Sequence, residues 1–239
     1  MPDNTAIILG ASGSVGQALL AEVLQSAHFN RVILVGRRSL QLPPVRAGVT
    51  VEQCLVPDMQ PQALRQAVAA ALRDVESSAA GFSVLGVGAG TAKLTLAQHR
   101  AVDVELNAAF AAGLKDSGRL QHLVFMSAIG ADANARATGS GAAGMPRYAR
   151  VKGEAAQAVL AQGPAVVSIF RPSLIVGSQH TPALLASALS LLSPLTPAKY
   201  RPIRTTEIAR AMVAVARNAP TASAIYNYSE MKALNAAER

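Results

Sequence analysis

Tyr148 and Lys152 stand four residues apart in the segment RYARVKGEAA, and this spacing could support proton transfer. On a helix, residues four apart lie on one face. A nearby ammonium favours the phenolate form of a tyrosine and lowers its pKa, so the phenol can exchange a proton with a carbonyl or alcohol oxygen near neutral pH. Lys152 could also reach a nicotinamide ribose. The pair indicates oxidoreductase chemistry, although a surface helix with its tyrosine packed on the core has the same spacing.

A third polar residue, Ser127, directly follows the apolar run His122–Met126, which is typical of a buried strand. A hydroxyl at the end of that strand could orient the same substrate oxygen that Tyr148 protonates. Because the three residue types have complementary roles, we predict Ser127, Tyr148 and Lys152 as the catalytic residues.

A glycine-rich turn lies near the start of the chain, in AIILGASGSVG. It follows a predicted strand, Ala6–Leu9, and opens a predicted helix, Val15–Ser26, which is the context of a dinucleotide-binding turn rather than of an ordinary strand–helix connection. Three glycines in this pattern permit the tight turn, the approach of a pyrophosphate and close helix–strand packing, and the helix amides hold the phosphates. The residues predicted to bind the cofactor here are Gly10, Ser12, Gly13, Ser14, Val15 and Gly16.

The cofactor type depends on the end of the second predicted strand, Arg31–Gly36. A free ribose 2′-hydroxyl favours an acidic residue there, but this chain has Arg37 and Arg38. Two guanidiniums can bind a 2′-phosphate, which favours NADP(H), although a solvated charge pair is the simpler interpretation. Asp58, after a third predicted strand over Val49–Val56, could accept a hydrogen bond from the adenine amino group or only face water.

Strand and helix patterns alternate along the first three quarters of the chain. Continuous apolar strands separated by helices predict a parallel sheet covered on both faces, and right-handed crossovers make it an α/β, doubly wound Rossmann sheet. The remaining predicted elements are helices over Pro61–Val75, Ala97–Leu114 and Arg147–Gln162 and strands over Gly81–Val87, His122–Met126 and Ala165–Phe170.

The pattern changes after Gly177. Ser178–Pro202 holds four prolines and an apolar helix, Thr205–Asn218 is amphipathic, and a short strand over Ala222–Tyr228 precedes a C-terminal helix. This segment is too small for an independent domain. We therefore predict a single NAD(P)-binding Rossmann domain over residues 1–239, in which residues 178–239 form a small cap on the substrate side. Gly130–Pro146, rich in glycine, alanine and serine, is predicted to be a loop.

Composition limits the class of protein and its partners. The 239 residues carry a net charge of +8, but the basic residues are scattered, so no nucleic-acid partner is expected. The N-terminus lacks the features of a signal peptide, and the apolar stretch Pro182–Pro194 is too short to cross a bilayer, so we expect a cytoplasmic protein without a membrane span. The four histidines lack metal-ligand spacing, so no metal is predicted and they are interpreted as structural or surface residues.

These motifs together resemble the atypical branch of the short-chain dehydrogenase/reductase superfamily, and more narrowly the TIP30-like group of NADPH-binding oxidoreductases. The matching segments, in chain order, are ILGASGSVGQALL, VILVGRR, VLGVGAG, FMSAIGAD, YARVKGEA and FRPSLIVG. The resemblance implies NADP(H), active-site roles for Ser127, Tyr148 and Lys152, cofactor contacts from Leu85 and Gly86, and a place for Arg171 near the nicotinamide.

Three functions fit these features. The first is an NADPH-dependent oxidoreductase that acts on an unknown small carbonyl or alcohol. The second is a non-catalytic NADP(H)-binding regulatory protein, because the resembling group has members with regulatory roles. The third is a nucleotide-sugar epimerase or dehydratase that holds NAD, against which Arg37 and Arg38 argue. A homodimer or a protein partner stays open. Asp103 and Glu105 are interpreted as a helix-face charge pair, with a supporting role at the nicotinamide as the alternative.

Overall fold

A seven-stranded parallel sheet forms the centre of the protein in a computed structural model that describes residues 4–75, 79–120, 122–177, 197 and 200–237. The strand order is β3-β2-β1-β4-β5-β6-β9, which confirms the doubly wound Rossmann fold. The strands are β1 (Thr5–Leu9), β2 (Arg31–Gly36), β3 (Thr50–Leu55), β4 (Ala79–Ser83), β5 (His122–Met126), β6 (Val166–Phe170) and β9 (Ala224–Tyr226).

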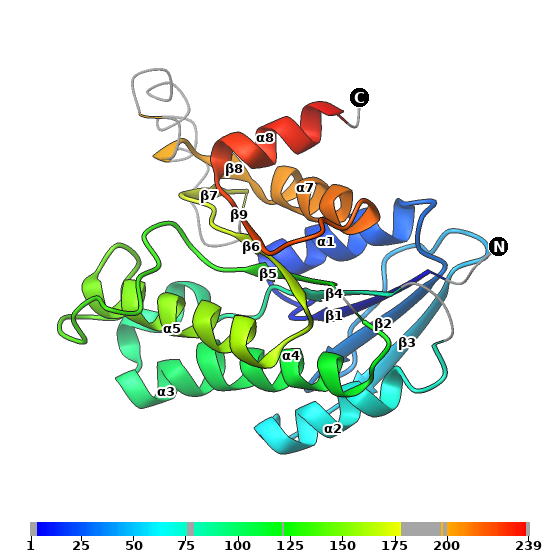
Figure 1. The fold of residues 1–239 in the computed structure, drawn as a ribbon, viewed down its shortest axis with the longest axis horizontal. Coiled ribbons are helices and arrows are strands. Elements are labelled where there is room, and N and C mark those ends of the chain that lie inside the picture. Colours follow the sequence, from blue (N-terminus) through cyan, green and yellow to red (C-terminus); the bar gives the residue numbers. More distant parts are fainter. Residues whose placement is uncertain (1–3, 76–78, 121, 178–196, 198–199, 238–239) are drawn as a thin grey trace.

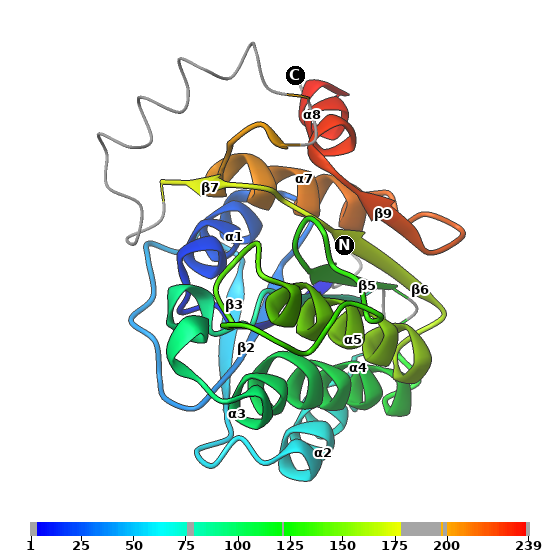
Figure 2. The same cartoon turned by 90° about the vertical axis from the view of Figure 1, so that its left-hand side faces the viewer.

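Helices cover both faces of the sheet (Figures 1 and 2). One face carries α1 (Ser14–Gln25), α7 (Thr205–Arg217) and α8 (Tyr228–Ala237); the other carries α2 (Pro61–Ala71), α3 (Leu96–Arg100), α4 (Asn107–Asp116) and α5 (Pro146–Gln162). Successive residues of a strand point to opposite faces. Accordingly, Ala6 and Ile8 pack beneath α1 and α7, whereas Ile7 and Leu9 pack against the other helical layer. This two-sided burial explains why the strands read as continuous apolar runs.

The helix predicted over Ala97–Leu114 is present but is not uniform. It consists of α3, a π-helical segment η2 (Ala101–Leu106) and α4 in direct succession. A π segment widens the helix locally, and such segments are frequent at functional sites. The polar residues that this turn places inside the molecule are described with the site below.

The strand predicted over Gly81–Val87 ends earlier, at Ser83. The backbone beyond it leaves the sheet because side chains of the neighbouring helix bind it: Asn107 donates to the Leu85 carbonyl over 3.4 Å, and the Val87 amide donates to Asp103 over 3.1 Å. A 3₁₀ helix, η1 (Gly88–Lys93), follows. The helix predicted over Pro61–Val75 also ends early, at Ala71, where turns replace it.

The C-terminal part contributes to the sheet and to its helical cover. β9 pairs with β6, α7 packs on α1, and a small second sheet joins β7 (Ile175–Val176) to β8 (Ile203–Arg204). The substrate-side cap stays a prediction, because 178–196, 198–199 and 238–239, including the expected apolar helix, lie outside the described residues. None of the helices described is long and apolar enough to cross a membrane.

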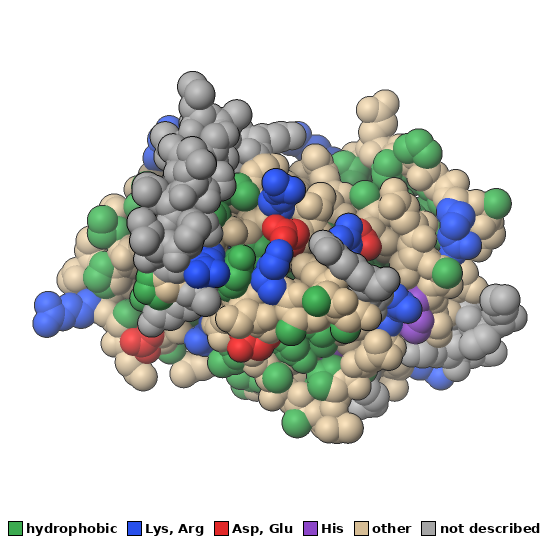
Figure 3. Space-filling model, turned by 90° about the horizontal axis from the view of Figure 1, so that it is seen from above, with side chains coloured by type: hydrophobic (Ala, Val, Ile, Leu, Met, Phe, Trp, Pro, Cys, Tyr) green, Lys and Arg blue, Asp and Glu red, His purple; other side chains and the backbone are tan. Residues whose placement is uncertain are grey.

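Charges on the face above α7 and α8 are mixed rather than gathered by sign. In Figure 3, lysine and arginine side chains lie beside aspartate and glutamate side chains. Two ion pairs account for part of this pattern: Lys232 with Glu207 at 2.7 Å, and Arg210 with Glu22 at 3.9 Å.

Candidate functional site

The predicted site residues follow the carboxyl ends of successive parallel strands, so they share one edge of the sheet. The strand order reverses between β1 and β4, and ligands of such sheets bind outside the carboxyl ends at this switch point. The sheet therefore brings the glycine turn after β1, the arginines after β2, Leu85 and Gly86 after β4 and Ser127 after β5 to a common edge.

The glycine turn after β1 has the geometry that its sequence predicts. Gly10 has φ +91°, and a Cβ on it would lie 2.7 Å from the Leu85 amide nitrogen, so only glycine fits. A Cβ on Gly16 would lie 2.8 Å from the Ala11 Cα, because α1 packs directly against the turn. In contrast, the nearest atom to a Cβ on Gly13 is 3.5 Å away, so a methyl group would fit at this exposed position in ordinary van der Waals contact.

The first turn of α1 is suited to phosphate. Its N-cap, Gly13, offers no side-chain hydrogen bond, and the first turn contains no acidic residue. The amides of this turn therefore lack a side-chain acceptor, and the helix dipole favours an anion there. Ser12 is exposed and Ser14 is half-buried at the same place, so their hydroxyls are available to a bound phosphate.

A cavity of about 370 Å³ connects the glycine turn with the end of β2. Gly10, Ser12, Arg37, Arg38 and Leu85 are among the residues that line it. Both arginines are exposed, and the ion pairs within the described part of the chain do not include them. The cavity has the donors and the shape for the adenosine end of a dinucleotide. The residues present thus fit the cofactor that the fold implies.

The backbone that carries Arg37 and Arg38 is fixed by the neighbouring strand. Gln53 on β3 accepts from the Leu40 amide over 2.7 Å and donates to the Leu40 carbonyl over 3.0 Å. Asp58 is exposed and does not belong to the cavity wall, whereas its neighbour Met59 does. A contact between Asp58 and adenine stays a prediction.

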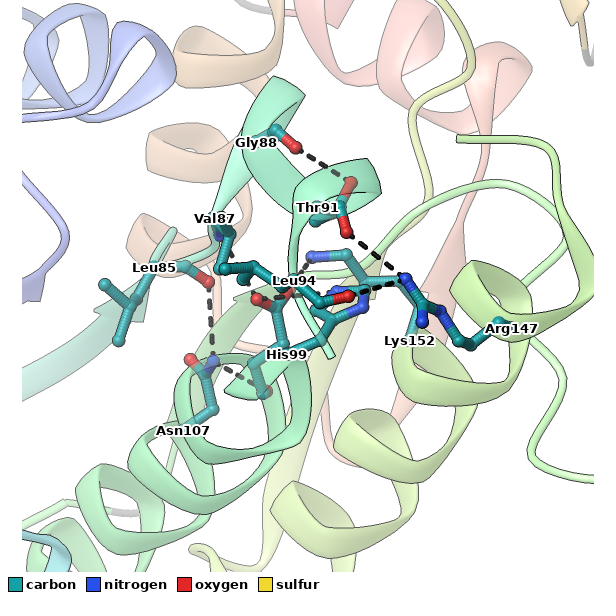
Figure 4. A network of polar contacts seen from close by, with 10 residues as sticks. Leu85, Val87, Gly88, Thr91, Leu94, His99, Asn107, Arg147 and Lys152 are labelled. Atoms are coloured by element: carbon teal, nitrogen blue, oxygen red, sulfur yellow. Dashed lines mark hydrogen bonds and ion pairs between the residues drawn. The ribbon is translucent and has the colours of Figure 1, made fainter. Parts of the chain in front are cut away.

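A buried ion pair lies on the nicotinamide side of this edge. The Lys152 ammonium from α5 lies 2.5 Å from Asp103 Oδ1 of η2, and the two side chains are 8% and 1% exposed. Asp103 Oδ2 accepts from the Val87 amide (Figure 4). A Cβ on Gly86 would lie 3.1 Å from the Lys152 nitrogen, so the ion pair sits directly beneath the exposed loop after β4.

Tyr148 lies beside this ion pair. The Lys152 nitrogen is 5.7 Å from the centre of the Tyr148 ring, and the Tyr148 ring centre is 6.0 Å from that of His99. The imidazole of His99 is fully buried, and its Nε2 lies 3.7 Å from Asp103 Oδ2. The predicted tyrosine–lysine pair is thus brought together by α5, with a carboxylate and an imidazole added from the α3–η2 segment.

Both members of the ion pair are charged at neutral pH. Burial raises the pKa of Asp103, but the Lys152 ammonium and His99 outweigh this effect and lower it to about 2. Burial likewise lowers the pKa of Lys152, but the charge of Asp103 outweighs it, so the pKa of Lys152 is raised. The carboxylate and the ammonium therefore stabilise each other in a place where burial opposes the charge of both.

Ser127 and Arg171 lie at the ends of β5 and β6. Ser127 is 3% exposed, and its hydroxyl donates to the Lys152 carbonyl over 3.4 Å, a long bond that a substrate oxygen could replace. Arg171 is half-buried, and its Nε is buried without a hydrogen-bond partner among the described residues. The strand ends thus hold Ser127 at the start of its loop, in contact with the α5 backbone.

The sequence contained a signal for the polar residues of the α3–α4 segment. His99, Asp103 and Asn107 recur every fourth residue, which places them on one helix face, and all three are buried. Asn107 donates to the Asp103 carbonyl over 2.9 Å and contacts the Ser83 hydroxyl through its Oδ1. The interpretation of Asp103 and Glu105 as a helix-face charge pair overlooked the buried position of Asp103, because only Glu105 is exposed.

Arg147 links the loop before α5 to the loop after β4. Its guanidinium donates to the Leu94 carbonyl over 2.8 Å and reaches the Thr91 carbonyl at 3.5 Å (Figure 4). The loop predicted over Gly130–Pro146 from its composition is present and contains no helix or strand up to Met145, and α5 begins at Pro146. Its backbone is fixed in part by the Asp132 amide, which donates to the Ala149 carbonyl over 2.9 Å.

The fold and the glycine turn define an NAD(P)-binding Rossmann protein. Two solved structures share this fold. MoeE5 in complex with UDP-glucuronic acid and NAD superposes with a TM-score of 0.65 at 16% identity, over 94% of this chain and 76% of that chain. A short-chain dehydrogenase/reductase from Serratia marcescens superposes with a TM-score of 0.63 at 18% identity, over 95% of this chain and 98% of that chain.

The chain belongs to the NAD(P)H-binding family, whose model matches residues 10–219. This membership and the shared fold confirm the resemblance to an atypical short-chain dehydrogenase/reductase. Among curated relatives, "Protein FMP52, mitochondrial" from Eremothecium gossypii is 30% identical over 179 residues, which cover 74% of this chain and 68% of that protein. The protein of the same name from Candida glabrata is 26% identical over 75% of this chain and 67% of that protein.

The names of these relatives correct one expectation. The absence of a signal-peptide pattern led to the prediction of a cytoplasmic protein, and this prediction is wrong, since both relatives are named as mitochondrial. The lack of a secretory signal, a basic segment followed by an apolar one, does not distinguish a cytoplasmic from a mitochondrial protein, because mitochondrial targeting does not require such a signal.

Proposed function

We propose that this protein is an NADPH-dependent oxidoreductase that acts on a small carbonyl compound or alcohol. The observation that carries the proposal is the pairing of two features along one sheet edge: a cavity lined by exposed Arg37 and Arg38, and a Tyr148–Lys152 pair on the other side of the switch point. When bound, the cofactor supplies or accepts a hydride at its nicotinamide.

The residues of the chain have separate roles in this proposal. The amides at the start of α1 bind the pyrophosphate, and Arg37 and Arg38 bind the 2′-phosphate of the adenosine ribose. Tyr148 exchanges a proton with the substrate oxygen, and Ser127 orients that oxygen. Lys152, from the helical turn after Tyr148, acts on the phenol through its charge and on the nicotinamide ribose through its hydrogen bonds.

Calorimetric titration with NADPH and NADH tests the choice of cofactor. Charge-assisted hydrogen bonds contribute about 1.5–3 kcal/mol, and at these exposed positions we expect the lower end, roughly tenfold in Kd for each arginine. The Arg37→Ser/Arg38→Ser variant should therefore bind NADPH roughly a hundredfold more weakly and NADH unchanged. Arg73→Ser, an exposed arginine beyond the end of α2, is the matched control. Equal affinity of the unmodified protein for both cofactors would contradict the proposed preference.

A second assay separates catalysis from sensing. A panel of small aldehydes and ketones is incubated with NADPH, and loss of NADPH absorbance is compared between the protein and its Tyr148→Phe variant. Turnover that disappears in the variant supports the oxidoreductase. Tight NADPH binding without turnover on any member of the panel would select the regulatory alternative. Retention of NAD through purification would instead favour chemistry of the epimerase type.

A further inference from the structure

The carboxylate of Asp103 binds two parts of the site at once. Oδ1 lies 2.5 Å from the Lys152 ammonium, and Oδ2 accepts from the Val87 amide over 3.1 Å. The first contact is with α5, which carries Lys152. The second is with the loop after β4, to which Leu85 and Gly86 also belong. Asp103 therefore joins the helix that carries Tyr148 to the loop expected at the nicotinamide.

The same carboxylate limits how much of the Lys152 charge acts on the phenol. The Lys152 nitrogen lies 5.7 Å from the Tyr148 ring centre, so an uncompensated ammonium would strongly favour a phenolate. Here the carboxylate is closer to the ammonium than the phenol is, and it offsets the charge. Burial makes this compensation effective, because water screens little at a site where both partners are below 10% exposure.

The other charged groups near Lys152 and Tyr148 do not provide the charge compensation that Asp103 provides. Arg147 is bound to backbone carbonyls of the η1 loop, and His99 faces Asp103 at 3.7 Å. Three charged or titratable side chains lie near Lys152 and Tyr148 on α3, η2 and α5: His99, Asp103 and Arg147. Glu154 is instead paired with Arg100 and Arg150.

We propose that Asp103 is a positioning residue of this site: it holds the Lys152 ammonium beneath the loop after β4 and offsets the charge that this ammonium exerts on the Tyr148 phenol. This inference rests on the proposed function. In the reductive step the carbonyl carbon would accept a hydride with its two electrons from bound NADPH, which would be oxidised to NADP+, and the C=O π bond would break. The Tyr148 O–H bond then breaks as its proton moves to the oxygen, and water returns a proton to the tyrosinate.

The ionisation of Tyr148 can be measured without any ligand. The chain has four tyrosines and no tryptophan, so its ultraviolet tyrosinate band is not obscured by indole absorption. Subtracting the pH titration of the same protein with Tyr148→Phe isolates Tyr148. From Coulomb's law at about 6 Å and an effective dielectric constant of about 20, we expect Asp103→Asn to lower the Tyr148 midpoint by about two pH units.

Three variants complete the experiment. Asp103→Glu should restore the midpoint, because it keeps the negative charge. Glu105→Gln, the same change of charge at an exposed position of η2, should leave the midpoint unmoved. Lys152→Met should raise it, since Asp103 would then face the phenol alone, and this variant provides the test if Asp103→Asn does not fold. Circular dichroism at each pH verifies that the fold persists.

The outcomes separate this inference from the proposed function. An unchanged Tyr148 midpoint in both Asp103→Asn and Lys152→Met, or a higher midpoint in Asp103→Asn, would overturn the role of Asp103, whatever the cofactor. Failure of the unmodified protein to bind NADPH, with the midpoints shifted as expected, would overturn the proposed function and leave the electrostatic role of Asp103 standing.

Discussion

The glycine turn permits a prediction that separates packing from ligand binding, because its second and third glycines face different surroundings. A Cβ on Gly16 would collide with the Gly10 carbonyl oxygen and lie 2.8 Å from the Ala11 Cα, both of which are backbone atoms of the turn. A Cβ on Gly13 would meet its nearest neighbour at an ordinary 3.5 Å. We therefore expect Gly16→Ala to destabilise the protein and Gly13→Ala to affect mainly the cofactor.

The magnitudes follow from these contacts. Overpacking against atoms that cannot rotate away costs about 3 kcal/mol at the upper end of its usual range, and a domain of this size loses about 2–4 °C in Tm for each kcal/mol. Gly16→Ala should thus melt about 6–12 °C below the unmodified protein. Gly13→Ala replaces an N-cap glycine, which costs about 1 kcal/mol or less, so its Tm should fall by no more than about 4 °C.

The assay is thermal unfolding followed by circular dichroism, paired with calorimetric titration of NADPH at a temperature where both variants are folded. A methyl group at Gly13 occupies the space through which a pyrophosphate would approach the backbone, so this variant should bind NADPH at least tenfold more weakly. Equal melting temperatures for the two variants would refute the packing argument. Undiminished NADPH binding by Gly13→Ala would refute the placement of the phosphates.

Three further predictions concern buried polar groups. Burial lowers the pKa of His122 to about 4. The stabilisation that the neutral imidazole gives the fold is therefore fully present above about pH 6.5, and about 3 kcal/mol of the free energy of unfolding is lost as the pH falls towards 4. Urea unfolding at both pH values should show this loss, and His122→Gln should lack it. The pKa of Asp103 is lowered to about 2, so its contribution is present above about pH 4 and is lost between pH 4 and 2; acid unfolding of Asp103→Asn should lack that component. Asn107→Ala should lower the free energy of unfolding by about 2–3 kcal/mol, because it leaves buried partners unsatisfied.

Much of the fold could be predicted because its signals are local. Apolar runs identified β1, β2 and β5 closely, since strands buried on both faces need continuous apolar residues. The end of β4 could not be predicted in this way. Val84 to Val87 continue the apolar pattern, but tertiary hydrogen bonds from Asp103 and Asn107 draw that backbone out of the sheet.

The candidate site shows the same limit. Tyr148 and Lys152 are neighbours through helix geometry, so their sequence spacing predicted their contact. The partner of Lys152, Asp103, lies 49 residues away in the sequence. A second acidic residue, Glu105, stands two positions further on, and the sequence alone does not show that Asp103 is buried and Glu105 exposed. A π segment further changes which residues of that helix point inward. Tertiary packing, rather than residue type, therefore decided which carboxylate joined the site.

The two sides of the site differ in how their cations are compensated. Arg37 and Arg38 are exposed, so water can solvate them until an anionic group binds, and they can discriminate a phosphate from a hydroxyl at little cost to stability. Lys152 is buried, and Asp103 stabilises its charge. A site with exposed cations on the adenosine side and a compensated cation beside the phenol suits an anionic cofactor tail and an uncharged reacting group. This contrast in charge supports the proposed exchange of a hydride with a small, uncharged carbonyl compound or alcohol.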